Sequence, residues 1–498
     1  MTLSRRYFVK NVVTGLYGQL IVIILGIIIP RIMIDSYGSD VNGIVSTTSQ
    51  IFSYLALLEA GIGQSARNAL YKPVLECNKV DISIVFVTAK NYYRKISVYY
   101  AVGVLSLAFV LPLFFKSKIS YHTIFLIVLI EGMSGVINFY FIQTPSILLN
   151  VDQKNYINNS INLANRIVCY ISKIVLPLCG ASIVIVQLAF FLFSVTKALI
   201  YRSYFNKKYD WINFNVKVDK NILKDRSSYL ITEVSWTIFS STDMIVLSLI
   251  VSTSMSSVYS VYNLIFTNIS LLLYSVSGGI LYILGNMYYK NKEDYTIVHD
   301  SFTSFVMTVI TILMSVSNVL CIPFVKLYTK DIVDVNYIYS NLPFLFASVQ
   351  ILSWSRYVSG YLTGIAGYAK STSYISFLEA IMNVILSIIF AYSFGIAGVL
   401  IATVLSLPLK VIWCIYISDY KILNRNCFKT IIIISSNYLM FFFISIAFNN
   451  INLNINNYYL FCVWGGILLI LLGIVIIFIN LLINKECYKT VKRYIFKS

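Results

Sequence analysis

Charged residues are scarce in this sequence, and histidine is nearly absent. Aspartate, glutamate, lysine and arginine make up 12% of the 498 residues, against 58% hydrophobic residues, and there are two histidines. Soluble globular chains carry about 25% charged residues, so this composition excludes that class and indicates a multi-pass membrane protein. The two histidines, His122 and His299, lie at the edges of expected loops, and we predict that both are solvated.

The sequence also lacks the short patterns that mark catalytic and metal sites. Its eight cysteines form no CxxC pair and no metal-ligand spacing, which argues against a zinc site and a disulfide framework. GxSxG, Walker A and HExxH motifs do not occur either. We therefore predict no catalytic residue, no bound metal and no cofactor apart from H⁺ or Na⁺ as a coupling ion, and we expect that the protein is not an enzyme.

Long apolar runs occupy most of the chain. About 20 apolar residues in a helix span the hydrocarbon core of a bilayer, so each such run predicts a transmembrane helix. We predict an all-α polytopic membrane protein with about 14 transmembrane helices. The expected spans are 11–34, 43–66, 96–115, 122–149, 157–178, 182–201, 227–251, 257–288, 302–325, 339–363, 372–394, 396–418, 430–448 and 458–483.

The order of spans repeats along the chain. A shift of 216 residues along the sequence places the span 11–34 on 227–250, and each copy of the repeat contains six spans. Because six is an even number, the second copy has the same orientation in the membrane as the first. This predicts two six-helix lobes related by a parallel pseudo-two-fold axis along the membrane normal. The predicted parts are an N-terminal lobe at 1–201, a basic cytoplasmic linker at 202–226, a C-terminal lobe at 227–418, and two further helices with a basic tail at 419–498.

The basic residues are unevenly distributed between the two sides of the predicted membrane domain. The chain has a net charge of +18, and 28 of its 38 lysines and arginines fall in the segments on the side of the termini. The opposite loops hold four: Lys116, Lys118, Lys326 and Lys330. Because cytoplasmic loops are rich in lysine and arginine, both termini are expected in the cytoplasm. This topology accounts for the positive charge, so we expect no nucleic-acid partner.

The expected span 157–178 carries a polar face through an apolar helix. Asn159, Asn162, Arg166 and Lys173 share one side at helical spacing. A charge deep in a bilayer costs at least about 2.5–3.5 kcal/mol, so each cation is expected to line a wet cavity or to have a partner. Lys173 has a third alternative, which is to extend outward to the interface. The acids weighed as partners are Glu59, Glu131, Glu233 and Asp243.

Two more cations lie within expected spans. Arg356 is predicted to line a cavity or to reach the inner headgroups, and Arg31 is predicted either to bind substrate or to pair with Asp35 at i+4. Three acids are interpreted as packing residues or as sites of H⁺ or Na⁺ coupling. These are Glu59, Glu233 and Asp243.

The first two expected spans form a hairpin with a polar stripe. The stripe includes Asn42, Ser49 and Ser53 and must meet another helix or a water-filled cavity. The stretch LGIIIPRIMIDSYGSDVNGIVSTTSQIFSYLALLEAGIGQSARNALYKPV, from Leu25 to Val74, resembles the opening of bacterial polysaccharide-repeat-unit flippases. These are the O-antigen and capsule (Wzx-like) members of the multidrug/oligosaccharidyl-lipid/polysaccharide exporter superfamily.

The resemblance implies a cargo and a location. It implies alternating-access flipping of undecaprenyl-diphosphate-linked oligosaccharides from the cytoplasmic to the outer leaflet of the bacterial inner membrane, for O-antigen or capsule biosynthesis. Membrane lipids and polysaccharide assembly proteins are the implied partners. Because guanidinium groups bind phosphate bidentately, the candidate substrate residues are Arg166, Lys173, Arg356, Arg31, Asn159 and Asn162. A small-molecule exporter of the same superfamily and a polysaccharide polymerase or ligase remain alternatives.

The charge asymmetry predicts the side of each loop. Reporter fusions made after Lys118, Lys330 and Asn452 should report an extracytoplasmic position, and fusions after Arg226 and Ser498 a cytoplasmic one, because basic loops stay inside. Paired alkaline phosphatase and fluorescent-protein fusions measure this. An extracytoplasmic signal after Ser498 would disprove the even number of spans.

Overall fold

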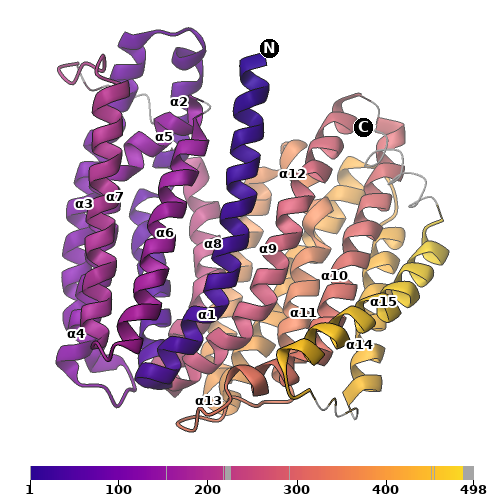
Figure 1. Ribbon diagram of the computed structural model, residues 1–498. Coiled ribbons are helices and arrows are strands. Elements are labelled where there is room, and N and C mark those ends of the chain that lie inside the picture. The colour runs from indigo at the N-terminus through magenta and orange to yellow at the C-terminus, as the bar shows by residue number, and fades with distance from the viewer. Residues whose placement is uncertain are drawn as a thin grey trace. The chain divides into compact units, whose positions relative to one another are not determined.

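The structure is a computed structural model that describes residues 2–152, 154–216, 218, 226–290, 292–449, 451, 453 and 455–485. Every regular element in these ranges is a helix (Figure 1). Nine helical stretches in them are long and apolar enough to cross a membrane. The chain is thus an all-α, multi-pass membrane protein, which confirms the predicted fold class.

Contacts between residues divide the chain into two compact units, 1–257 and 258–498, called unit 1 and unit 2 below. The elements of unit 1 are α1 (Thr2–Leu55), η1 (Ala56–Glu59), α2 (Ile62–Leu75), α3 (Lys79–Phe114), α4 (Tyr121–Ile137), η2 (Asn138–Ile142), α5 (Gln143–Val151), α6 (Asn155–Leu178), α7 (Ile183–Lys208), α8 (Arg226–Val246) and η4 (Leu247–Val251). Helix α9 (Thr253–Lys290) begins in unit 1 and continues in unit 2. The remaining elements of unit 2 are α10 (Lys292–Tyr328), α11 (Leu342–Ser355), α12 (Tyr357–Ile365), α13 (Ala369–Ile415), η5 (Tyr416–Ile422), α14 (Phe428–Asn449) and α15 (Tyr458–Ile483).

Two long helices each contain a sharp break at a glycine. Gly38 in α1 has φ 82° and ψ 165°, and Gly395 in α13 has φ 56° and ψ −128°. Positive φ is readily adopted by glycine because it has no Cβ atom. The breaks fall in the turns predicted between the first two spans and between spans eleven and twelve. With α1 and α13 each counted as two spans, every predicted span lies mainly on helix, although the span 43–66 is interrupted between η1 and α2 and the span 339–363 between α11 and α12.

Some helices continue well beyond their apolar runs. Helix α3 begins at Lys79, although its apolar span was expected to begin near residue 96. The side chain of Asn78 caps this start by accepting hydrogen bonds from the backbone N–H groups of Val80 (3.1 Å) and Asp81 (3.2 Å). Hydropathy detects only the apolar turns of a helix, whereas a capped polar turn continues it without any apolar signal.

The early start of α10 corrects the prediction for one histidine. His299 was expected to be solvated, but it is fully buried, and its Nε2 atom lies 3.3 Å from the hydroxyl of Ser359 and 3.2 Å from that of Ser418. The prediction was wrong because it treated residues before 302 as a loop, whereas they form a helical turn packed in the interior of unit 2. His122 is exposed, as predicted.

A buried ion network lies next to His299. The guanidinium of Arg425 donates to Asp300 at 2.6 and 2.9 Å and to Asp419 at 2.7 and 2.9 Å. Burial by itself disfavours the cation, yet the two carboxylates hold the pKa of Arg425 above its ordinary value. This network joins the segment before α14 to the first turns of α10.

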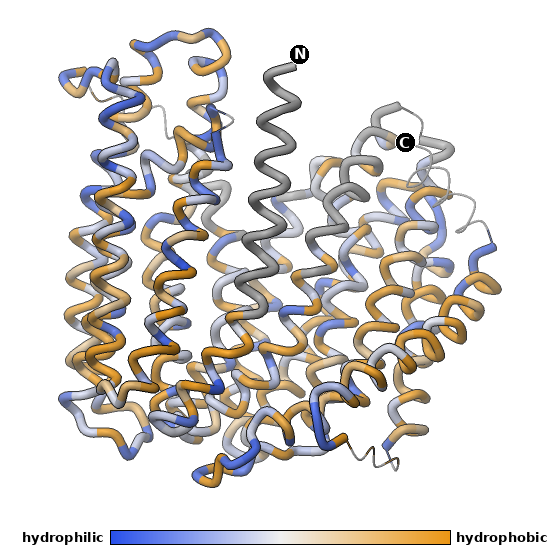
Figure 2. Tube along the Cα trace, viewed as in Figure 1, coloured by the Kyte–Doolittle hydropathy of each residue, from blue (hydrophilic) through white to orange (hydrophobic). Residues whose placement is uncertain are grey.

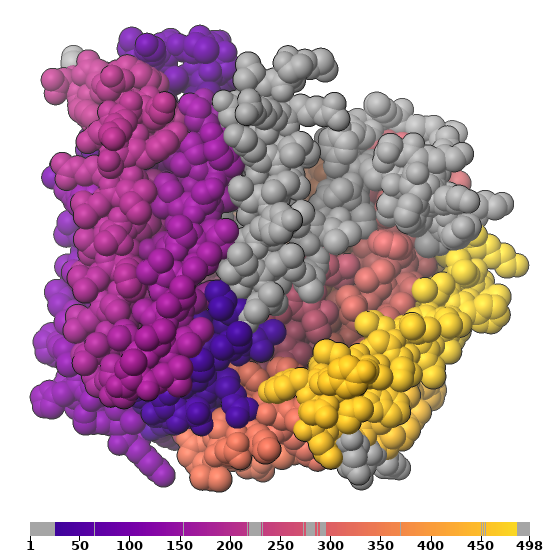
Figure 3. Space-filling model, in the orientation of Figure 1, coloured from indigo at the N-terminus to yellow at the C-terminus, as the bar shows by residue number. Residues whose placement is uncertain are grey.

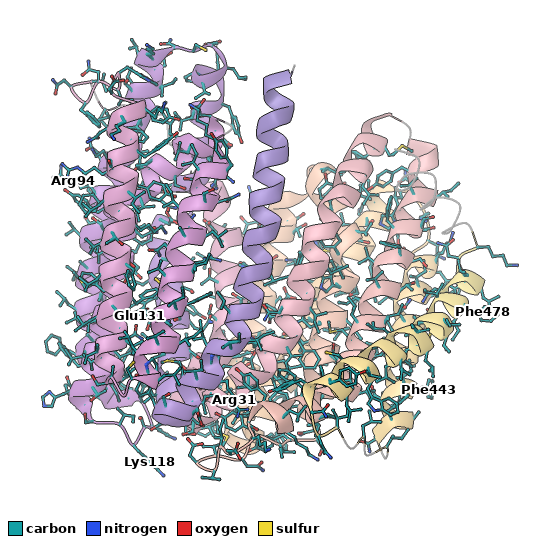
Figure 4. The ribbon with its side chains drawn as sticks, viewed as in Figure 1. Arg31, Arg94, Lys118, Glu131, Phe443 and Phe478 are labelled. Carbon is teal, nitrogen blue, oxygen red and sulfur yellow. The ribbon has the colours of Figure 1, made fainter. Side chains whose placement is uncertain are left out.

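Apolar side chains fill the interior and cover much of the surface. Ile44, Val104 and Ile127 are fully buried in the core of unit 1, while Phe443 and Phe478 are 63% and 62% exposed and point outward from α14 and α15 (Figure 4). Figure 2 shows hydrophobic residues along the middle of most helices, interrupted by hydrophilic ones. Exposed apolar residues on such helices are suited to contact with lipid tails.

The division into units does not follow the linker expected at 202–226. It falls at residue 257, because α8 packs against α1 within unit 1. The lobes at 1–201 and 227–418, and the parallel repeat that relates them, stay predictions.

The packing of α1 predicts the effect of one small substitution. A Cβ atom at Gly43 would clash with the backbone carbonyl oxygen of Thr253. Gly43→Ala should therefore force α1 and the start of α9 apart, at a cost of about 1–3 kcal/mol or more in stability. The measurement is the thermal unfolding midpoint of the purified protein. The control is Gly26→Ala, also on α1, where a Cβ atom meets nothing within 4 Å; equal midpoints for the two variants would contradict the close approach.

Candidate functional site

The second half of α1, from Ser39 to Leu55, lies between two sets of polar side chains in unit 1. One set belongs to α8, η4 and the start of α9 and is hydrogen-bonded to α1 through buried or half-buried groups. These bonds join Asn42 to Ser257 (2.8 Å), Thr47 to Ser248 (2.5 Å) and Tyr54 to Thr242 (2.5 Å). Of these three residues, Asn42 belongs to the predicted polar stripe, so at this position the stripe meets another helix, one of the two outcomes that the sequence predicted.

Ser49 of α1 contacts a carboxyl group of α4. The Ser49 hydroxyl donates to Oε1 of Glu131 at 2.5 Å, and Glu131, labelled in Figure 4, belongs to α4. Within the described part of the chain, the buried Oε2 atom of Glu131 has no hydrogen-bond partner. Ser49 and Ser53 are exposed. At Ser49 and Ser53, α1 thus presents exposed hydroxyl groups, and the carboxyl group bound to Ser49 is incompletely satisfied.

Three cations on the neighbouring helices form what we call the α6–α7 cation face: Arg166 and Lys173 of α6 and Lys197 of α7. Arg166 is exposed, and the two lysines are half-buried. The Lys173 ammonium lies 4.9 Å from the ring centroid of Phe190, and its charge acts on Glu131. The charges of Arg166 and Lys197 act on each other. Figure 3 shows α6 and α7 on the visible surface of unit 1.

The alternative that Arg166 has a structural acid partner is not supported. Among the described residues, Arg166 forms no ion pair with a carboxylate. Three like charges on two adjacent helices repel one another, so an anion bound at this face would be stabilised electrostatically.

The asparagines of α6 have different environments. Asn159 and Asn162, predicted to share the polar face, are half-buried. Asn158 is buried instead: it donates to the Ser146 carbonyl at 2.9 Å and accepts from the Tyr201 hydroxyl at 3.0 Å. Asn158 thus joins α5, α6 and α7, which leaves Asn159 and Asn162 as the accessible amides next to Arg166.

Arg31 lies apart from these residues along the chain. It is half-buried on α1, ahead of the break at Gly38, and Figure 4 shows it near the end of unit 1 that carries Lys118. The structure does not place Arg31 on the α6–α7 cation face, and its role in substrate binding stays a prediction.

The acids considered for ion coupling have structural neighbours. Oε2 of Glu233 accepts from the backbone N–H of Gly61 at 2.8 Å, at the N-terminus of α2, where a negative charge is favourable. Glu59 accepts two hydrogen bonds from Gln143, at 3.1 and 3.2 Å. Asp243 is buried next to Thr242 in α8. These contacts agree with the packing interpretation of Glu233 and Glu59, and ion coupling stays a prediction.

Arg356 forms an ion pair in unit 2. It separates α11 from α12, and its guanidinium donates to Oε1 of Glu379 on α13 at 2.5 Å, with both side chains nearly buried. The ion pair with Glu379 accounts for the charge of Arg356 within the protein, without a wet cavity or contact with lipid headgroups. The pair gives Arg356 a structural role, and its role in substrate binding stays a prediction.

Sequence reasoning missed Lys197 as a member of the site and considered Glu131 only as an ion-pair partner. Lys197 is a single charge in the span 182–201, and which helix it faces depends on the packing of α7 against α6. Glu131 likewise gained its place through contact of α4 with α1. No cluster of three metal-ligating side chains occurs in the described ranges.

Solved structures of known membrane proteins have a fold similar to that of this chain. Neither a protein-family model nor a curated protein matches the sequence.

Three solved structures show the similarity. The inward closed lipid II flippase MurJ has a TM-score of 0.67 at 14% identity, over 95% of this chain and 99% of its own. An inward-facing multidrug resistance MATE family transporter has a TM-score of 0.66 at 14% identity, over 86% and 99%. A MOP superfamily transporter from Pyrococcus furiosus, described as having a binding pocket of reverse polarity, has a TM-score of 0.60 at 13% identity, over 85% and 97%.

The ion pair of Arg356 predicts a loss of stability. Arg356→Ala leaves Glu379 buried without its partner, a change that costs about 3–5 kcal/mol. We expect the lower end of this range because the charge of Lys410 also acts on Glu379. Protein abundance in the membrane and the thermal unfolding midpoint should both fall, and Arg356→Ala with Glu379→Gln should recover part of the loss. The exposed Lys370→Ala in α13 is the charge-matched control; if Arg356→Ala behaves like it, the pair is not structural.

Proposed function

We propose that the protein flips undecaprenyl-diphosphate-linked oligosaccharide repeat units from the cytoplasmic to the outer leaflet of the bacterial inner membrane by alternating access, in O-antigen or capsule assembly. In this proposal both termini lie in the cytoplasm, and polysaccharide assembly proteins act on the flipped product. H⁺ or Na⁺ would supply the coupling ion.

The α6–α7 cation face is the observation that carries the proposal. Arg166, Lys173 and Lys197 place three positive charges on α6 and α7 in unit 1, and the charge of Lys173 acts on the carboxyl group of Glu131. A lipid diphosphate must move its negative charge past roughly 30 Å of hydrocarbon, and cations along the route lower that barrier. Guanidinium binds phosphate bidentately, and the amides of Asn159 and Asn162 offer hydrogen bonds to phosphate or sugar.

Two of the compared structures bear on this proposal. One is a flippase for a lipid-linked molecule, lipid II, and another transporter of the same fold is described as having a pocket of reverse polarity. They support the hypothesis that transporters of this fold share the helical bundle and differ in cargo because the charge of the binding face differs.

A small-molecule exporter is the second candidate. It is favoured by the MATE family transporter, whose TM-score of 0.66 is nearly that of the lipid II flippase. A cationic drug would be repelled by the α6–α7 cation face, whereas an anionic small molecule would not. The test of function therefore has to include drug export as well as polysaccharide display.

Substitution of Arg166 tests the proposal. Because Arg166 is exposed and has no ion pair among the described residues, Arg166→Ala should leave membrane abundance near wild type. It should abolish surface-polysaccharide display in a flippase-deficient cell, while Arg166→Lys should retain partial display because it keeps the charge and loses the planar fork. The measurements are display and protein level in the same cells, with drug resistance scored in parallel.

The control for this test is Lys207→Ala, which removes an exposed positive charge from α7 outside the cation face. It should leave display unchanged. Normal display by Arg166→Ala at normal abundance would refute the role of Arg166. Failure of the wild-type protein to restore display, together with raised drug resistance, would favour the exporter.

A further inference from the structure

A cavity of about 530 Å³ lies in unit 1, away from the α6–α7 cation face. Its walls come from α3, the η2–α5 stretch and α7, together with Phe214 of the segment after α7, and no residue of α6 lines it. A cavity of this size falls in the range of sites that bind small ligands or headgroups.

Cations from two helices surround the cavity. Lys90 and Arg94 are four residues apart on α3, so they lie on one face, and Arg202 and Asn206 have the same spacing on α7. Three positive charges and one amide therefore line a single cavity. Within the described ranges, Lys90, Arg94 and Arg202 form no ion pair with a carboxylate.

Aromatic rings hold two of these cations in place. The Lys90 ammonium lies 4.4 Å from the ring centroid of Phe214, and the Arg94 guanidinium lies 5.4 Å from that of Tyr140. Cation–π contacts favour these positions without neutralising the charge. The positive charge thus remains available to an anion.

The rest of the cavity wall is packed rather than loose. Phe86 and Phe205 stack at 4.9 Å between α3 and α7, and the backbone N–H of Asn213 donates to the Ser83 hydroxyl at 3.2 Å. This hydrogen bond holds the segment that carries Phe214 against α3. A preformed wall reduces the cost of ordering a ligand.

We propose that this cavity binds a phosphate group. Two guanidinium groups can each donate two hydrogen bonds to phosphate oxygens, the Lys90 ammonium adds a point charge, and Asn206 adds an amide donor. The proposal does not rest on the flippase function, because none of these residues belongs to the α6–α7 cation face.

The phosphate has two potential sources, a lipid headgroup and a soluble phosphate. Figure 4 shows Arg94 at the outer edge of unit 1, on the side of α3 that is away from α1. Arg94 and Arg202 are exposed. Basic pockets between transmembrane helices on the side of the basic loops are suited to anionic lipid headgroups, so the lipid is the source that the geometry favours.

The test uses the purified full-length protein in an uncharged detergent. Three probes are titrated separately: a phospholipid with an anionic glycerol phosphodiester headgroup, the matching phosphocholine lipid, and inorganic pyrophosphate. Native mass spectrometry measures binding, and the thermal unfolding midpoint measures stabilisation. The wild type should bind the anionic lipid more tightly than the phosphocholine lipid, and Arg94→Gln with Arg202→Gln should weaken this binding about tenfold for each guanidinium removed.

The matched control is Lys95→Gln with Lys207→Gln, which removes two exposed charges from α3 and α7 outside the cavity and should keep wild-type binding. Arg94→Lys with Arg202→Lys should bind with intermediate affinity, which distinguishes phosphate recognition from misfolding. Pyrophosphate binding that only the cavity variant loses would support the phosphate site and identify a soluble source. Equal loss in the cavity and control variants, or no loss in the cavity variant, would overturn the proposal.

Discussion

Polar groups within a membrane-spanning helix need partners, and the second half of α1 shows how this chain meets that requirement. Asn42, Thr47 and Tyr54 are hydrogen-bonded to α8, η4 and the start of α9, while Ser49 donates a hydrogen bond to Glu131 of α4. The packing is so close that Gly43 has no space for a side chain. These contacts hold α4, α8, η4 and the start of α9 against α1 in unit 1.

The positively charged side chains have different partners in different parts of the chain. In unit 2, Arg356 pairs with Glu379, and Arg425 pairs with Asp300 and Asp419. Among the described residues, the cations of the α6–α7 cation face and of the cavity beside α3 form no such ion pairs, although the charge of Lys173 acts on Glu131. Buried pairs have a structural role, whereas accessible cations outside ion pairs favour the binding of anions. This contrast, more than the number of cations, points to phosphate-bearing ligands.

The fold by itself does not determine the function of this chain. It is similar to that of a lipid II flippase and, to nearly the same degree, to that of a multidrug transporter. Proteins that share a fold differ in function through the side chains of their sites. For this chain the informative helices are α6 and α7, whose exposed polar face is cationic.

The sequence by itself determined that the chain is an all-α, multi-pass membrane protein, where its helices lie and where the two glycine breaks fall. Apolar length, helical period and the backbone freedom of Gly38 and Gly395 are local properties. It also placed Arg166 and Lys173 on one face of α6. Only the tertiary structure decided what each polar face meets: Lys197 joins Arg166, Glu131 meets Ser49, His299 is buried, and Glu379 neutralises Arg356. These outcomes depend on contacts between residues far apart in the chain, which hydropathy and helical spacing do not encode.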